Sequence, residues 1–287
     1  MARVISTINL KGGVGKTTTT VGLAEFLSAE FGKKVLVIDL DPQTNATIVL
    51  IGEERWKELN VSGRTLVSLF NDALRPDGTA ARFDLGAAIQ RGVSPVAQVK
   101  SVDLLPSSLD LIDVQDRLAA MPPGKFFANN PTDLLRPAIK PILDDYDYVL
   151  IDCPPNLGIV TLNGLRVSDG YIIPTIPDLL STYGIPQIQT RAKSFADSIG
   201  ENIRELGIVV TKYRSASTVH TNTVKRLVAD PNLPRVFNTK IAEGNAIAAS
   251  AEFAPTSTLK QKYGYDGGAE TMRALALEFM TAAEGIK

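Results

Sequence analysis

NLKGGVGKTTTT, at residues 9–20, is the most informative segment of this sequence. Its Gly-Lys-Thr at 15–17 matches the end of the phosphate-binding P-loop pattern G-x-x-x-x-G-K-[ST]. The first glycine of that pattern should stand at position 10, but this position is Leu10, and Lys11 follows it. The segment is therefore a modified P-loop with a second lysine, to which the ordinary pattern gives no role.

The glycines and hydroxyl residues of this loop predict a nucleotide site. A glycine-rich turn between a strand and a helix directs backbone N–H groups at an anion, and the helix N-terminus adds partial positive charge. Lys16 is expected to reach the β- and γ-phosphates, Thr17 to offer its hydroxyl to Mg²⁺, and Thr18 to contact the α-phosphate. The predicted contacts are Gly12, Gly13, Val14, Gly15, Lys16, Thr17 and Thr18.

The rest of the chain alternates short β-branched apolar runs with longer segments of helical character. This alternation is typical of a parallel sheet covered by helices on both faces. The predicted strands are 3–10, 33–41, 101–108, 146–155, 169–177 and 203–213. The predicted helices are 16–30, 63–74, 109–121, 132–145 and 267–285. We therefore expect a doubly wound, mostly parallel α/β fold of the P-loop type, in a single domain over residues 1–287.

Composition excludes several classes of protein. The single cysteine, Cys153, excludes an internal disulfide and fits a reducing compartment. A formal net charge of −1 gives the whole chain no general attraction to nucleic acid. No apolar run reaches the about 18 residues of a membrane span, and the N-terminus lacks a secretory signal. We expect a cytoplasmic protein without membrane contact.

Carboxylates follow two of the predicted strands. YDYVLIDCPP is an apolar run that ends in Asp152, which is placed to hold the metal through water as a Walker-B aspartate. Asp39 and Asp41 end the second strand, where catalytic groups collect in open α/β sheets. Asp41 lies nearer the loop and is the better candidate to orient an attacking water. Asp39 is expected either to support the metal site or to be structural.

Three segments together resemble the deviant-Walker ATPases of the ParA/MinD superfamily. They are KGGVGKTTT, VLVIDLDPQTNAT and YDYVLIDCPPNLGIVTLNGL. The similarity is greatest to the ParA (Soj)-type partition ATPases, and it continues through VSDGYIIPTIPDLLSTYG and LGIVVTKY over nearly the whole chain. It implies a homodimer that encloses ATP and Mg²⁺ and hydrolyses ATP to ADP and phosphate, slowly unless a partner stimulates it.

The resemblance gives the two lysines different roles. In this family the extra lysine, here Lys11, crosses to the partner subunit and contacts the phosphates of the partner's ATP. Lys16 then serves the nucleotide bound to its own chain. Triphosphate charge buried between subunits needs compensation, so a lysine supplied in trans makes dimer stability depend on the nucleotide. The alternative for Lys11 is a solvated loop lysine.

The same resemblance implies roles for further residues. Asp41 would position the water, and Asp152 would hold Mg²⁺ through water. Thr211, after the strand LGIVV, falls where the family contacts adenine. The second switch loop would contain Pro154, Pro155 and Gly158.

Other branches of the superfamily fit less well. The chain starts directly with its first strand, so we expect no N-terminal helix-turn-helix extension. A MinD-like membrane ATPase should end in a basic amphipathic helix, but 267–285 carries Glu270, Arg273, Glu278 and Glu284 and is not basic. The nitrogenase iron protein needs two cluster-ligating cysteines per subunit, whereas this chain has only Cys153. Dethiobiotin synthetase and the cobyrinate amidases share the fold, but the DLDPQTN and DCPPNLG segments argue against them.

Basic residues concentrate between residues 204 and 240. Seven basic and two acidic residues give this segment a net charge of +5, which suits nonspecific DNA binding by a dimer. The basic residues are Arg204, Lys212, Arg214, Lys225, Arg226, Arg235 and Lys240. The alternative is an ordinary solvated face. Chromosomal relatives carry arginines just beyond this region, where this chain has AEGNA at 242–246.

The resemblance thus implies an ATP-dependent switch that positions DNA or another large cargo over the nucleoid, with a ParB-like adaptor. Two alternatives stay open. The same switch could position a protein cargo, such as a carboxysome or a chemoreceptor cluster. A metabolic ATP-dependent ligase or amidase is the third class, and it requires a small-molecule acceptor for nucleotide turnover.

Overall fold

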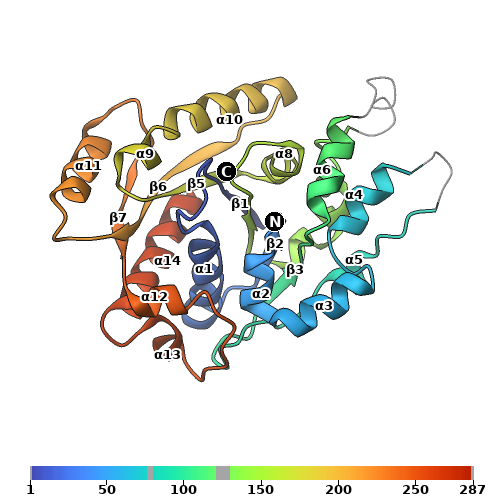
Figure 1. The fold of residues 1–287 in the computed structure, drawn as a ribbon, viewed down its shortest axis with the longest axis horizontal. Helices are drawn as coiled ribbons and strands as arrows, with labels where there is room; N and C mark the ends of the chain where they lie inside the picture. The colour runs from blue at the N-terminus through green and yellow to red at the C-terminus, as the bar shows by residue number, and fades with distance from the viewer. Residues whose placement is uncertain (1, 76–79, 121–129, 286–287) are drawn as a thin grey trace.

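Seven strands form one parallel sheet at the centre of the computed structural model, which describes residues 2–75, 80–120 and 130–285 (Figure 1). The order across the sheet is β3-β2-β4-β1-β5-β6-β7, and every pair of neighbouring strands is parallel. The strands are β1 Arg3–Thr7, β2 Val35–Asp39, β3 Val102–Leu105, β4 Tyr148–Asp152, β5 Gly170–Thr175, β6 Arg204–Tyr213 and β7 Val236–Ala242. The predicted α/β fold is confirmed.

Helices cover both faces of this sheet (Figure 1). The helices before β4 are α1 Lys16–Phe31, α2 Asn45–Ile51, α3 Glu53–Val61, α4 Val67–Ala73, α5 Leu85–Ala88, α6 Leu111–Ala119, α7 Leu135–Ile139 and the 3₁₀ helix η2 Lys140–Asp145. Those after β4 are α8 Ile159–Val167, α9 Leu179–Thr182, α10 Ile185–Ile199, α11 Thr218–Ala229, α12 Asn245–Ala249, α13 Leu259–Tyr263 and α14 Gly268–Glu284. Within the described ranges, no helix is long and apolar enough to cross a membrane.

Alternation along the strands divides the core into two layers. Successive strand residues point to opposite faces of a sheet. Val4 packs in the layer of α6, α8 and α10, whereas its neighbour Ile5 packs in the layer of α1 and α14. Val35–Asp39 and Tyr148–Asp152 are buried throughout, as expected for central parallel strands covered on both faces. Because β1 lies between β4 and β5, the loop that follows it lies near the middle of the row formed by the carboxyl ends of the strands.

The differences from the sequence prediction have local causes. β7 was not predicted, because it is an edge strand in which only Phe237 and Ile241 are fully buried. The predicted helix 132–145 divides into α7 and η2, since Pro141 lies in the first turn of the 3₁₀ helix. Two short helices, α2 and α3, follow the polar turn after β2, where no helix was predicted. Met121, at the end of predicted helix 109–121, lies outside the described residues.

A buried ion pair fastens α1 to the C-terminal part of the chain. The Lys262 ammonium donates to the Glu25 carboxylate at 2.8 Å, and both side chains are almost completely buried. The Tyr263 hydroxyl and the Ser94 hydroxyl also donate to this carboxylate, at 2.7 and 2.8 Å. All three donors therefore compensate one buried negative charge, as such a charge requires.

Replacing Lys262 by Met should destabilise the chain by about 3–5 kcal/mol, because Glu25 would stay buried without its counter-charge. Urea denaturation followed by circular dichroism measures this loss. Arg273→Met is the matched control, since it removes the exposed Arg273–Glu30 pair that joins α14 to α1. The control should cost no more than about 1 kcal/mol. Similar losses in the two variants would contradict the importance of the buried pair.

Candidate active site

The glycine-rich loop runs from the end of β1 into α1 and has the backbone that its sequence predicts. Gly13 and Gly15 have φ angles of +73° and +82°, in the left-handed region that favours glycine. A Cβ on Gly15 would also lie 3.5 Å from the Thr211 side chain. α1 begins at Lys16, so its free N–H groups face the loop. This geometry suits an anion at the helix N-terminus.

The predicted magnesium residues lie in direct contact. The Thr17 hydroxyl donates to Asp152 Oδ2 at 2.6 Å. Thr20 lies one turn further along α1, and its hydroxyl donates to Thr7 Oγ1 at 2.9 Å. Thr7 is the register partner of Asp152 in the β1–β4 pair. The first turn of α1 is thereby held against the carboxyl ends of two central strands, with a hydroxyl and a carboxylate side by side.

Burial and neighbouring charges shift the pKa values of the central ionisable groups. Burial raises the pKa of Asp152 to about 7, and Asp41 adds to the rise, whereas the Thr17 hydrogen bond and the Lys16 charge oppose it. Burial lowers the pKa of Lys16, against the attraction of Asp152 and Asp41. Asp39 is fully buried, and its pKa is raised well above the usual value by burial and by Asp152. Hydroxyl and carboxylate oxygens are hard donors that fit Mg²⁺.

Asp39 and Asp41 have different surroundings. The Asp39 carboxylate accepts hydrogen bonds from the Thr47 N–H and hydroxyl at 2.9 and 2.7 Å, and from the Asp41 N–H at 3.1 Å. These contacts favour the structural alternative for Asp39, which fixes the loop that carries Asp41. Asp41 accepts from the Gln43 N–H at 3.0 Å and acts electrostatically on Lys16 and Asp152. The water-orienting role of Asp41 remains a prediction.

The two lysines point to different neighbours. Lys16 Nζ donates to the Lys11 carbonyl at 3.3 Å and lies among the carboxylates. Lys11 Nζ donates to the Ser181 hydroxyl at 2.9 Å and lies 3.6 Å from Asp178 Oδ2. Its side chain is 40% exposed. Lys11 is thus directed away from the phosphate loop of its own chain and toward α9.

Comparisons with known proteins establish the family of this chain. A family model described as an AAA domain matches residues 2–205. The chromosome-partitioning ATPase Soj of Thermus thermophilus is 30% identical, over 98% of this chain and 97% of that protein. The chain is a ParA-type P-loop ATPase. The similarity to this relative thus extends over nearly the whole chain.

Solved structures share the fold of this ParA-type ATPase. A structure titled cobyrinic acid a,c-diamide synthase from Mycobacterium smegmatis, with bound ADP and magnesium, has a TM-score of 0.74 at 27% identity and covers 100% of this chain and 97% of that chain. An ATP complex of a single-residue variant of McdA from Cyanothece has a TM-score of 0.75 at 22% identity, with coverages of 100% and 97%. The second likeness concerns the fold alone.

The structure gives contacts for two further predicted parts of the ParA-type ATPase, the switch loop and Thr211. The predicted switch loop, with Pro154, Pro155 and Gly158, follows β4 directly, and a Cβ on Gly158 would lie 3.0 Å from Gln115 Oε1 of α6. The Thr211 hydroxyl donates to the Val14 carbonyl at 2.8 Å. Thr211 therefore supports the phosphate loop from β6, and its contact with adenine stays a prediction.

The basic residues of 204–240, which include the predicted DNA residues, do not form one group. Lys212 and Arg214 lie at the end of β6, where Lys240 stacks 5.9 Å from the Tyr213 ring and Arg214 pairs with Glu243. Lys225 and Arg226 are exposed on α11. Arg235 precedes β7 and stacks on Phe237. Arg204 begins β6, so about nine residues of extended strand, roughly 30 Å, separate it from Tyr213.

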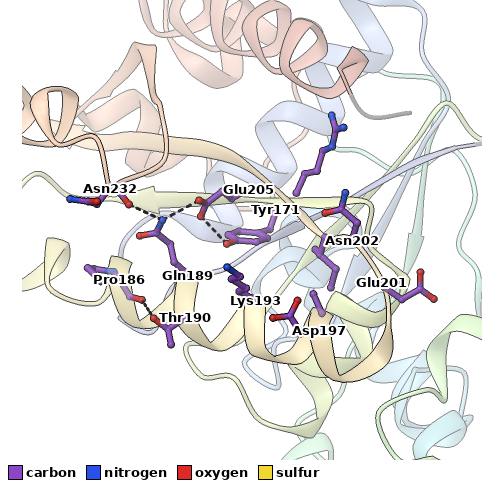
Figure 2. Close-up of a pocket in the computed structure, with 13 residues that line it drawn as sticks. Tyr171, Pro186, Gln189, Thr190, Lys193, Asp197, Glu201, Asn202, Glu205 and Asn232 are labelled. Atoms are coloured by element: carbon purple, nitrogen blue, oxygen red, sulfur yellow. Dashed lines mark hydrogen bonds between the residues drawn. The ribbon is translucent and has the colours of Figure 1, made fainter.

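A large polar groove of about 770 Å³ lies between α10 and the starts of β5 and β6, away from the phosphate loop (Figure 2). Gln189 donates to Glu205 at 3.0 Å and to the Asn232 carbonyl at 3.2 Å. The Tyr171 hydroxyl donates to the same carboxylate at 2.9 Å. Figure 2 shows these groups directed at one another. The candidate nucleotide site is instead the phosphate loop, where helix dipole, lysine and hydroxyl groups converge.

Stability should depend on pH through Asp152. Its pKa rises from an ordinary 3.8 to about 7 on folding, so the folded chain binds the proton more tightly than the unfolded chain. The free energy of unfolding of the nucleotide-free chain should therefore fall between about pH 4 and pH 7, by up to ~4 kcal/mol from this group. Asp152→Asn should flatten this fall in urea titrations. The exposed control Glu252→Gln should keep it, and an unchanged slope in Asp152→Asn would contradict the assignment.

Proposed function

We propose that this protein is an ATP-dependent dimerising switch that binds DNA nonspecifically and positions DNA with a ParB-like, cargo-bound adaptor. The observation that carries the proposal is the pair of lysines in one loop. Lys16 faces the carboxylates of its own site, whereas Lys11 is directed outward to α9. An ATPase that acts alone needs only the first of these lysines. The second suits a nucleotide site completed by another copy of the chain.

The residues around the phosphate loop have separate tasks in the proposed reaction. Lys16 and the N–H groups of 12–18 would bind the triphosphate. Thr17 and, through water, Asp152 would hold Mg²⁺. Bound Mg²⁺ neutralises charge that develops on the phosphate oxygens. Asp41 would orient the water in line with the scissile bond, and Asp39 keeps the Asp41 loop in place through Thr47.

Dimerisation follows from charge in this proposal. Two triphosphates enclosed between two subunits repel each other and lose their hydration, so each needs added positive charge. Lys11 of each subunit would supply it to the ATP of the other. ATP would then stabilise the dimer by mass action, and hydrolysis stimulated by the adaptor would release it. We infer a cytoplasmic, nucleoid-associated protein with all its residues in one ATPase domain.

DNA binding would use Lys225 and Arg226 of α11 together with the group of Lys212, Arg214 and Lys240. These side chains can contact phosphates of any sequence, which is why the binding would be nonspecific. Arg235 would add charge at the start of β7. A dimer doubles the number of phosphate contacts, so nucleotide-dependent dimerisation would also control DNA affinity.

The likeness to the structure titled cobyrinic acid a,c-diamide synthase, at 27% identity, favours one second candidate. An ATP-dependent amidase or ligase would turn over nucleotide only with a small-molecule acceptor. A switch with a protein cargo is a variant of the main proposal and would keep the dimer without the DNA. ATP hydrolysis assayed with DNA, with adaptor and with cobyrinic acid separates these functions.

DNA binding measured with ATP, with ADP and without nucleotide tests the switch. We expect salt-sensitive binding with ATP alone. Asp41→Ala should prolong it, because ATP persists when the water is no longer oriented. Fluorescence anisotropy of a labelled random duplex at several salt concentrations gives both affinity and salt dependence. Equal binding in the three nucleotide states would refute the switch.

Replacing both Lys225 and Arg226 by Glu should abolish DNA binding and leave ATP-dependent dimerisation intact. The physical reason is the loss of two phosphate contacts per subunit and the repulsion from two new carboxylates. Lys33→Glu with Lys34→Glu is the matched control. It makes the same charge change just before β2. The strands begin at this end of the sheet, whereas the phosphate loop lies at the other end, where the strands finish. If the α11 double variant keeps its DNA affinity and the control loses it, the DNA-binding surface lies near Lys33 and Lys34 and not on α11.

A further inference from the structure

Lys11 has two partners on α9, the short helix that follows β5. The Ser181 hydroxyl accepts a hydrogen bond from Lys11 Nζ at 2.9 Å, and Asp178 Oδ2 lies 3.6 Å from the same nitrogen. Asp178 also accepts from the Ser181 N–H at 2.6 Å, as the N-cap of this helix. Together Asp178 and Ser181 form what we call the α9 anchor. The anchor holds an ammonium group that the proposed function requires at another subunit's phosphates.

The backbone on both sides of this contact is fixed. The Lys11 N–H donates to Asn9 Oδ1 at 2.9 Å, and the Asn9 amide donates to the Pro174 carbonyl at 2.8 Å. The phosphate loop is therefore tied to the end of β5, two residues before the segment that leads into α9. With both backbones held, the Lys11 side chain is the part that can change partners.

We propose that Asp178 and Ser181 are positioning residues that hold Lys11 in its own chain, and that Lys11 must leave this anchor before two chains can close over ATP. This inference rests on the proposed function. A phosphate group of ATP carries more negative charge than one carboxylate, so it can displace Asp178 from Lys11. An exposed ion pair is weak, which keeps the exchange reversible.

α9 also has exposed apolar side chains. Leu180 and Tyr183, just beyond the helix, are 75% and 66% exposed, and Leu179 is also exposed. A second copy of the chain that receives Lys11 would cover these side chains, since they belong to the same turn as the anchor. Release of the lysine and burial of apolar surface would then occur in one event, which makes α9 sensitive to the partner subunit.

Burial would raise the pKa of Asp178, but the Ser181 hydrogen bonds and the Lys11 charge lower it below the usual value. Asp178 is thus a charged partner of Lys11 at neutral pH. Asparagine has the same shape and caps helices equally well, so Asp178→Asn removes the charge and keeps the cap. The chain offers a matched control. Asp84 caps α5, another four-residue helix, by accepting from the Ala87 N–H.

The experiment compares Asp178→Asn and Asp84→Asn with the wild type. In ATP, the dimer dissociation constant from analytical ultracentrifugation should fall about two- to thirtyfold in Asp178→Asn, because each of two lysines no longer leaves an ion pair. It should not change in Asp84→Asn. Lys11→Ala alone should weaken the ATP dimer, and adding Asp178→Asn to it should neither tighten that dimer nor weaken it further, since the two residues act through one contact.

A second measurement uses the nucleotide-free chain. Labelling of Lys11 by an amine-reactive reagent, quantified by mass spectrometry, should be faster in Asp178→Asn than in the wild type or in Asp84→Asn. An unchanged labelling rate, or a dimer no tighter than wild type, overturns the anchor. A wild-type chain without any ATP-dependent dimer overturns the proposed function, and the labelling result then still decides whether the anchor holds Lys11.

Discussion

The hydrogen bond from the Thr17 hydroxyl to the Asp152 carboxylate connects the phosphate loop to the sheet. It can form because β1 lies directly beside β4 with Thr7 opposite Asp152. The loop that leaves β1 therefore enters α1 within reach of the neighbouring strand's last carboxylate. A different strand order would place these two oxygens apart, although both motifs would be unchanged in sequence. The nucleotide chemistry thus depends on a topological constraint, the central place of β1.

That constraint also concentrates charge. Parallel pairing places Asp39 opposite Asp152 at the ends of β2 and β4, and Asp41 follows close by. Three carboxylates then share a small buried volume with one ammonium group, from Lys16, and burial raises the pKa of two of them. Such perturbed groups are typical of functional sites. The arrangement lacks positive charge, which a bound divalent cation would supply.

How much the sequence could predict depended on the range of the interactions. The phosphate loop was predictable because its glycines meet local demands of the backbone, which the φ angles of Gly13 and Gly15 confirm. The separation of the basic residues into distant groups was not predictable, because a count of charges does not show that Arg204 lies at the start of β6. The contact of Lys11 with Ser181 spans 170 positions and carries no sequence signal beyond the loop itself. The edge strand β7 was not predictable, because its sequence VFNTKIA has no continuous apolar run.

Leu10, which stands where the ordinary pattern has its first glycine, makes a packing contact that a glycine could not make. Its side chain is half-buried and packs against the core layer of α6, α8 and α10. A Cβ on Gly184, just before α10, would lie 4.0 Å from the Leu10 Cβ, so the two backbones are close. A glycine at position 10 would have no side chain to make this contact. Leucine thus ties this part of the loop to the start of α10, next to the residue whose ammonium group contacts Asp178 and Ser181.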